Sequence, residues 1–146
     1  MKTSMAKTAG YLLAGLMAFG LPTDSRADDY QKLIRQCQND PAYRVGGAAV
    51  GECLEVRVGE LDKRMGTLLK TQAKGMCKQP LALMREAQKQ WQEYRGSFCQ
   101  VFPALFDNTA MYVNSQACAL RLTLARLDDL KFLNTYRPGQ PLPCED

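Results

Sequence analysis

The sequence predicts an all-α protein, a disulfide-stapled antiparallel bundle of three long helices with a short helix before them. Apolar residues recur in steps of three and four along three long segments, which is the period of a helix that buries one stripe. No segment of strand length shows the alternating pattern of a β-strand. Six cysteines, all placed after an export-type N-terminus, add a covalent framework. The alternation of the two steps favours helices packed nearly antiparallel at shallow angles.

The N-terminus has the features of a secretory signal peptide. Lys2 and Lys7 supply a positive start, residues 11–21 form an apolar run, and Ser25 and Ala27 place small residues where a signal peptidase cleaves. The run is shorter than the roughly 20 residues that a membrane span requires. No cysteine lies at the cleavage point to carry a lipid anchor. We therefore expect residues 1–27 to be removed, leaving a soluble periplasmic or secreted chain without stable membrane insertion.

The mature chain has the organisation of one domain with a tail. Residues 28–136 suit one helical domain with one core. In residues 137–146, three prolines and a glycine exclude a regular helix. The leader holds three of the 19 basic residues and one of the 15 acidic residues, so the formal charge falls from +4 to +2 in the mature chain. The charges alternate in sign along each segment, which argues against nucleic-acid binding.

The first two helices are expected over residues 30–37 and from Leu54 onward. Charged residues such as Glu55 and Lys63 separate the apolar positions of the second helix. Its predicted buried stripe comprises Leu54, Val58, Leu61, Met65 and Leu68. A short connection is expected at residues 75–79, where Gly75 precedes the next helix.

The third helix opens at Pro80, a residue favoured in the first turn. The period predicts that Trp91, Tyr94 and Phe98 pack in the core, although such aromatic residues can also form a sugar-binding or partner-binding platform. Arg95 lies beside this stripe, and we expect its guanidinium to have a structural role, pairing with an acid or with helix carbonyls. The full predicted stripe is Met84, Ala87, Trp91, Tyr94, Phe98 and Val101.

The fourth helix follows a short connection at residues 103–108. Asp107 or Asn108 can cap its N-terminus through the side-chain oxygen. Its predicted buried stripe comprises Val113, Ala117, Leu120, Leu124 and Leu127.

The cysteine pairing follows from hairpin symmetry, because residues equidistant from the turn of an antiparallel helical hairpin lie opposite each other. Cys99 and Cys118 are equidistant from the region of residue 108, and Cys37 and Cys53 are equidistant from residue 45. These four cysteines are expected to form two clips across two hairpins.

The remaining cysteines are Cys77, in the second connection, and Cys144, in the tail. An antiparallel last helix ends near the start of the third helix, so the tail emerges close to Cys77. We therefore expect a third bond between Cys77 and Cys144. Metal binding is the rival use of cysteine, but the chain lacks both a Cys-x-x-Cys pair and histidine, so no metal site is expected.

The same lack of histidine removes the commonest general base and any Ser-His or Cys-His nucleophilic pair. Two carboxylate pairs remain, Glu52 with Glu55 on one helix face and the adjacent Asp128 and Asp129. A carboxylate pair can cleave glycosidic bonds, but solvated surface charges are the commoner role of such residues. There is also no glycine-rich phosphate loop. The expectation is a protein that is not an enzyme and holds no cofactor.

Five residues spaced Gln-x-x-Trp-x-x-Tyr-Arg-x-x-x-Cys resemble the signature of the LprI-like lysozyme-inhibitor domain family; they are Gln88, Trp91, Tyr94, Arg95 and Cys99. The likeness covers about residues 35–131. It extends to further positions before and after the signature, namely Glu52, Cys53, Asp62, Leu68, Leu69, Cys118, Thr123, Arg126 and Leu127. Most of these residues are ones already assigned to the core and the cystines, so the motif is expected to be mainly structural.

Members of this family are small exported helical proteins, mostly bacterial, and the family name comes from lysozyme inhibition attributed to some of them. The resemblance implies a periplasmic or secreted protein that binds a lysozyme or another peptidoglycan hydrolase. Gly96 departs from the family pattern, which usually has an aspartate after the arginine. Residues 107–109 replace a glycine-rich link, and the pair of Cys77 and Cys144 looks like an addition.

Inhibition of this kind needs a rigid protrusion that enters the substrate cleft of the enzyme, since rigidity lowers the ordering cost of binding. Residues 39–49 and residues 102–108 are the two candidate protrusions, each held by a cystine at its base. The candidate partner-binding residues in them are Asn39, Asp40, Arg44, Asp107 and Asn108. The alternative function is a non-enzymatic accessory or interaction module of the cell envelope with no lysozyme target. A mature charge of +2 offers no long-range attraction to strongly basic animal lysozymes.

Overall fold

The computed structural model describes residues 25–43, 46–106, 108–135 and 144. All regular structure in these ranges is helical, which confirms the predicted all-α class. The elements are α1 (Ser25–Asn39), the 3-10 turn η1 (Pro41–Tyr43), α2 (Gly46–Ala73), α3 (Lys78–Cys99), α4 (Val101–Leu105) and α5 (Thr109–Thr135). Of the predicted leader only residues 25–27 lie inside the described ranges, and of the predicted tail only Cys144.

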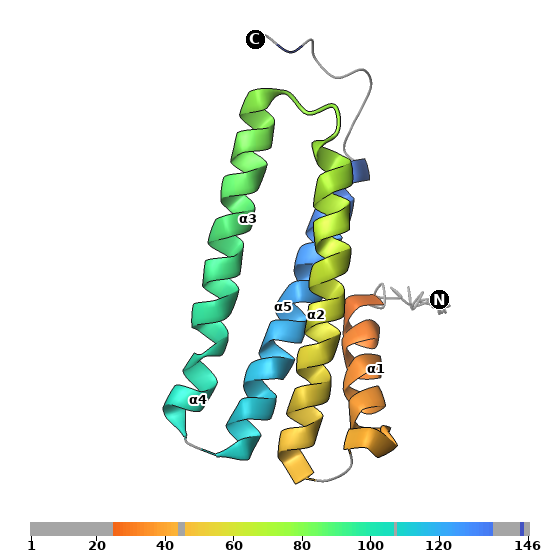
Figure 1. Ribbon diagram of the computed structural model, residues 1–146, viewed down its shortest axis with the longest axis vertical. Coiled ribbons are helices and arrows are strands. Elements are labelled where there is room, and N and C mark those ends of the chain that lie inside the picture. The colour runs from red at the N-terminus through yellow and green to blue at the C-terminus, as the bar shows by residue number, and fades with distance from the viewer. Residues whose placement is uncertain (1–24, 44–45, 107, 136–143, 145–146) are drawn as a thin grey trace, which may run out of the picture.

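The long helices run alternately down and up one common axis (Figure 1). α2 and α5 run in the same direction side by side and share the most extensive contact in the molecule. α1 packs against both of them, while α3 contacts α5 and α4. α1 ends, and α2 and α5 begin, at one end of the molecule, which we call the loop end. α2 and α5 end, and α3 begins, at the opposite end, called here the far end.

The core lies between α2 and α5, where the predicted stripes of the two helices meet. Four of its buried side chains come from α2 and four from α5; they are Leu54, Val58, Leu61, Met65, Leu120, Leu124, Leu127 and Leu130. Tyr30, Leu33 and Ile34 of α1 cover one side of this cluster. Full burial of one such aliphatic side chain stabilises the fold by about 1.5–3 kcal/mol.

The predicted buried stripe of α3 is wrong: the face that is buried is displaced around the helix axis by about one residue from the predicted face. Tyr94 is 50% exposed and Phe98 40% exposed, and their rings stack on each other with centroids 5.4 Å apart. Trp91 is half-buried and packs against the core. The buried residues of α3 are Gln88 and Cys99. The inward face therefore carries polar groups, because they find hydrogen-bond partners on α2 and α5 that apolar periodicity cannot reveal.

Two residues of the predicted connections, Gly75 and Asn108, have the expected roles, whereas α4 occupies much of the predicted connection at residues 103–108. Gly75 has a φ of +78° after the end of α2, a left-handed conformation that favours glycine. At the start of α5, the Asn108 side-chain oxygen accepts a hydrogen bond from the Met111 amide at 3.1 Å, as a helix cap does. The first two helices are longer than predicted: α1 covers Ser25–Asn39, and α2 begins at Gly46, so residues 46–49 of the first predicted protrusion are helical.

Three disulfides join Cys37 to Cys53, Cys77 to Cys144 and Cys99 to Cys118, which confirms the two pairs predicted from hairpin symmetry and the third pair expected between the remaining cysteines. Their Cα–Cα distances of 5.6, 5.3 and 5.6 Å lie in the usual range for cystines. Two of the bonds are near the loop end, one tying α1 to α2 and the other tying α3 to α5. The bond of Cys77 lies at the far end.

None of the helices in the described ranges combines the length and the apolarity needed to cross a membrane.

Candidate functional site

Three residues of the family likeness, from three different helices, meet at the middle of the molecule. The Arg95 guanidinium on α3 donates two hydrogen bonds to Asp62 on α2, from Nη1 to Oδ1 at 2.7 Å and from Nη2 to Oδ2 at 2.9 Å. Its Nη1 also donates to the Thr123 hydroxyl on α5 at 2.7 Å. Thr123 in turn donates to the Ala119 carbonyl. One guanidinium therefore connects α2, α3 and α5 in a bidentate geometry that only arginine can supply.

A second contact lies one to two turns farther along the same interface. Gln88 is buried; its Nε2 donates to the Met65 sulfur at 3.1 Å, and its Oε1 accepts from the Arg126 Nε at 3.1 Å. Trp91 lies between the two arginines, with its ring centroid 4.9 Å from the Arg95 Cζ and 6.0 Å from the Arg126 Cζ. Both distances are within the range of cation–π attraction. The predicted structural role of Arg95, pairing with an acid, matches its contact with Asp62.

These contacts bring together most of the signature. Three of its five residues, Gln88, Trp91 and Arg95, take part in one network at the junction of α2, α3 and α5, together with Asp62, Thr123 and Arg126 from the wider family likeness. Tyr94 points to the exposed side and stacks on Phe98. The network satisfies buried polar groups and sets the position of α3, so its chemistry is that of a structural clamp.

A polar cleft of about 350 Å³ opens beside the Arg95 contact, and Gly96 is on its lining together with Glu55 and Asp62. A Cβ added at Gly96 would meet no atom within 4 Å, apart from the helix's own nearby backbone. The position therefore has room for a side chain, including the aspartate that is usual there in the family that the chain resembles.

The predicted carboxylate pairs lie on the surface. The Tyr112 hydroxyl donates to Glu55 Oε2 at 3.0 Å, and Tyr112 also covers Gly51 of α2. Burial raises the pKa of Tyr112 above its ordinary 10.0, and the hydrogen bond to Glu55 and the charges of Glu55 and Glu52 raise it further. At the far end, the Asp128 carboxylate accepts from Lys131 at 3.0 Å. Asp129 is exposed.

The described residues of the two candidate protrusions both lie at the loop end (Figure 1). Asn39 closes α1 by donating from Nδ2 to the Arg35 carbonyl, and the Asp40 carboxylate accepts from the Ala42 amide at 2.9 Å. A Cβ at Gly47, near the start of α2, would lie 3.5 Å from Thr109 at the start of α5. Arg44 and Asp107 fall outside the described residues.

Sequence reasoning missed the short helix α4 (Val101–Leu105) and treated most of it as a turn. Val101, Leu105 and Phe106 are exposed there, with Phe106 at 63%. An apolar run in a connection between helices is the signal that could have identified them, because connections are usually polar. With Phe98 of α3 they make four exposed apolar residues in α4 and directly beside it, at the loop end, and we call this set the α4 patch.

Comparison with known proteins gives one match. A family model described as "Lysozyme inhibitor LprI" matches residues 37–130. Searches of curated proteins and of solved structures find no match. The matched segment runs from Cys37 to Leu130 and contains the whole clamp of Asp62, Arg95 and Thr123.

Proposed function

Because the chain belongs to the LprI lysozyme-inhibitor family, we propose that it is an exported protein that binds a lysozyme-type muramidase and blocks its substrate cleft. The observation that carries the proposal is the family match over residues 37–130, in a chain whose signature residues Gln88, Trp91 and Arg95 belong to one network of contacts. The family is one of inhibitors, which agrees with a role that is not enzymatic.

We assign the loop end as the binding face. Both candidate protrusions begin or end there, and the bonds of Cys37 with Cys53 and of Cys99 with Cys118 tie their bases to the bundle. A protrusion held in this way loses little conformational entropy when it binds. The α4 patch supplies exposed aromatic and aliphatic side chains of the kind that anchor protein interfaces.

The distribution of charge supports the same face. Residues 28–43, 46–61, 96–106 and 108–122, which form the loop half, carry four Lys and Arg against six Asp and Glu. Beyond the Arg95 contact, residues 63–94 and 124–135 carry nine Lys and Arg against four Asp and Glu. The net charge of the whole mature chain is near neutral, but the loop half is acidic and attracts a basic enzyme, while the far half is basic and repels one.

The direct test is hydrolysis of cell-wall substrate by lysozymes of several classes, each with a stoichiometric amount of purified mature protein. We expect at least one lysozyme to lose most of its activity. The double variant Leu105→Ala and Phe106→Ala should weaken inhibition by about tenfold or more, since it removes central apolar anchors. Phe132→Ala is the matched control, because Phe132 is 60% exposed at the far end. Undiminished hydrolysis by every lysozyme would contradict the function, and equal losses in both variants would contradict the binding face.

One observation favours the second candidate, an accessory module of the cell envelope. The signature residues Gln88 and Arg95 face the interior and hold helices together, so the family pattern itself specifies the fold more directly than a partner. Affinity capture from an envelope extract distinguishes the two functions. Recovery of an assembly component without any muramidase would favour the accessory role.

A further inference from the structure

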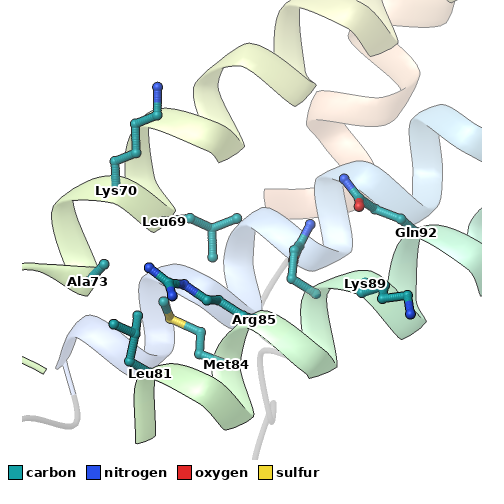
Figure 2. A pocket seen from close by; sticks show the side chains of 9 residues that line it. Leu69, Lys70, Ala73, Leu81, Met84, Arg85, Lys89 and Gln92 are labelled. Atoms are coloured by element: carbon teal, nitrogen blue, oxygen red, sulfur yellow. The ribbon is translucent and has the colours of Figure 1, made fainter. Parts of the chain in front are cut away.

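A groove runs between the last turns of α2 and the first half of α3, away from the loop end. Its volume is about 270 Å³, just below the range of pockets that hold small organic ligands. Leu69 projects into it from α2, and Leu81 and Met84 project into it from α3 (Figure 2). Along this stretch α3 buries only Gln88, so the groove keeps apolar side chains accessible.

The charged residues that line the groove all have the same sign. They are Lys70 from α2 and Arg85 and Lys89 from α3, and no carboxylate lines it. Arg85 extends across the groove, and Lys70 points outward at its rim (Figure 2). Within the described ranges neither Lys70 nor Arg85 has an ion pair or a side-chain hydrogen bond, while Lys89 lies 4.0 Å from Glu93. Two cations are therefore available for an incoming anion.

The half of the molecule around the groove also has a positive net charge. Residues 63–94 and 124–135 carry nine basic residues against four acidic ones. An apolar floor with one basic group across it and others at its rim is complementary to a molecule with one apolar chain and one anionic head group. At about 270 Å³ the groove can cover much of a single alkyl chain and has no room for a second one.

We propose that the groove between α2 and α3 binds a single-chain anionic amphiphile of the fatty-acid class. The chain lies on Leu69, Leu81 and Met84, and the carboxylate is held by Arg85 with Lys70 beside it. The site is separate from the loop end. A ligand there would touch none of the residues proposed to contact a lysozyme.

Trp91, the single tryptophan of the chain, provides the readout, because it lies between Gln88 and Gln92 on the α3 segment that lines the groove. The mature protein is titrated with laurate below its micelle concentration, and tryptophan fluorescence and calorimetry are recorded. We expect saturable binding at one site. Dodecanol, which has the same chain length without the charge, should bind about tenfold or more weakly.

Two variants locate the site. Lys70→Gln with Arg85→Gln should raise the Kd for laurate about tenfold or more, whereas the charge-matched control Lys63→Gln with Arg64→Gln should change it less than about twofold. Ala73→Phe, which fills the groove without changing its charge, should also abolish binding. Circular dichroism of each variant verifies that the helices are retained.

Three results would overturn the proposal. The first is equal weakening in the two charge variants, which would indicate diffuse attraction to the basic half. The second is equal affinity for dodecanol and laurate, which would remove the role of the cations. The third is a response only to micelles or to vesicles of anionic lipid, which would indicate a membrane surface as the ligand.

Discussion

At the scale of single residues, Arg95 makes the most connections between helices. Its guanidinium bonds Asp62 through both terminal nitrogens and also bonds Thr123, and its plane lies near the Trp91 ring. The Arg95 side chain is 17% exposed and that of Asp62 is 37% exposed. Removing one partner of a buried pair costs about 3–5 kcal/mol, and partial exposure reduces the cost.

We therefore expect Arg95→Met to lower the free energy of unfolding by about 2–3 kcal/mol. Arg95→Lys should lower it by about 1–2 kcal/mol, because an ammonium cannot bond both carboxylate oxygens in the same geometry. Urea denaturation with intact disulfides, followed by circular dichroism, measures both values. Lys131→Met breaks the surface pair with Asp128 and should cost less than about 1 kcal/mol. Similar losses in Arg95→Met and Lys131→Met would contradict the clamp.

Tyr112 gives a pH dependence at the same scale. Its raised pKa means that the folded chain holds the phenol proton more tightly than the unfolded chain does. The resulting stabilisation is complete below pH 10.0, the ordinary tyrosine value, and is lost as the pH rises through the higher folded-state pKa.

We expect Glu55→Gln to lower the pKa of Tyr112 toward 10.0, since it removes a negative charge beside the phenol. Ultraviolet absorbance of tyrosinate during an alkaline titration measures the change, and Tyr112→Phe identifies which transition belongs to this residue. Asp128→Asn, at the far end, should leave that transition unmoved. An unchanged pKa in Glu55→Gln would remove Glu55 as a cause.

At the scale of elements, two glycines of α2 have different surroundings and therefore different effects on stability. A Cβ added at Gly66 would point into open space, whereas Gly51 lies directly under the Tyr112 ring. Gly66 only weakens the helix, because glycine loses more backbone entropy than alanine on folding. Gly51, by contrast, permits the close approach of α5 to α2.

Gly66→Ala should accordingly raise the free energy of unfolding by about 0.5–1 kcal/mol. Gly51→Ala should lower it, because the new Cβ would overlap the Tyr112 ring and force α5 or the ring to move. Thermal denaturation of the two single variants beside the parent protein measures both signs. A gain in stability from Gly51→Ala would show that the ring moves freely and that the contact does not set the spacing of the helices.

At the scale of the whole molecule, the two ends differ in charge and in covalent bonding. The loop half is acidic overall and has two disulfides at the bases of its loops, whereas the far half is basic and has the bond of Cys77 with Cys144. The sequence separations of 67 for that bond and 19 for Cys99 with Cys118 predict different stabilisation, because a longer closed loop restricts the unfolded chain more.

Removing Cys77 and Cys144 as a pair of alanines should lower the free energy of unfolding by about 4 kcal/mol, and removing Cys99 and Cys118 should lower it by about 3 kcal/mol. Inhibition should be weakened more by removing Cys99 and Cys118 than by removing Cys77 and Cys144, because the bond of Cys99 with Cys118 holds the base of the α4 patch. Chemical denaturation and the lysozyme assay, made on the same samples, compare the two orders. Loss of inhibition in proportion to stability alone would argue against the loop end as the binding face.

Much of this architecture could be predicted from the sequence because its determinants are local. The three-and-four spacing of Leu54, Val58, Leu61 and Met65 identifies the buried side of α2 whatever it packs against. Equal distances from a turn are likewise a property of the chain, and the observed cysteine pairs follow them.

The orientation of α3 required the tertiary structure. Apolar periodicity turns Tyr94 and Phe98 inward, but Gln88 and Arg95 occupy that side, because Asp62, Thr123 and Arg126 offer them bonds from other helices. The energy of such bonds depends on groups far apart in the chain, so no local pattern contains it. The sequence by itself determined the three long helices, the cystines and the family. Only the packing of three helices decided which side of α3 faces solvent, and with it the exposed apolar surface at the loop end and the basic groove at the far end.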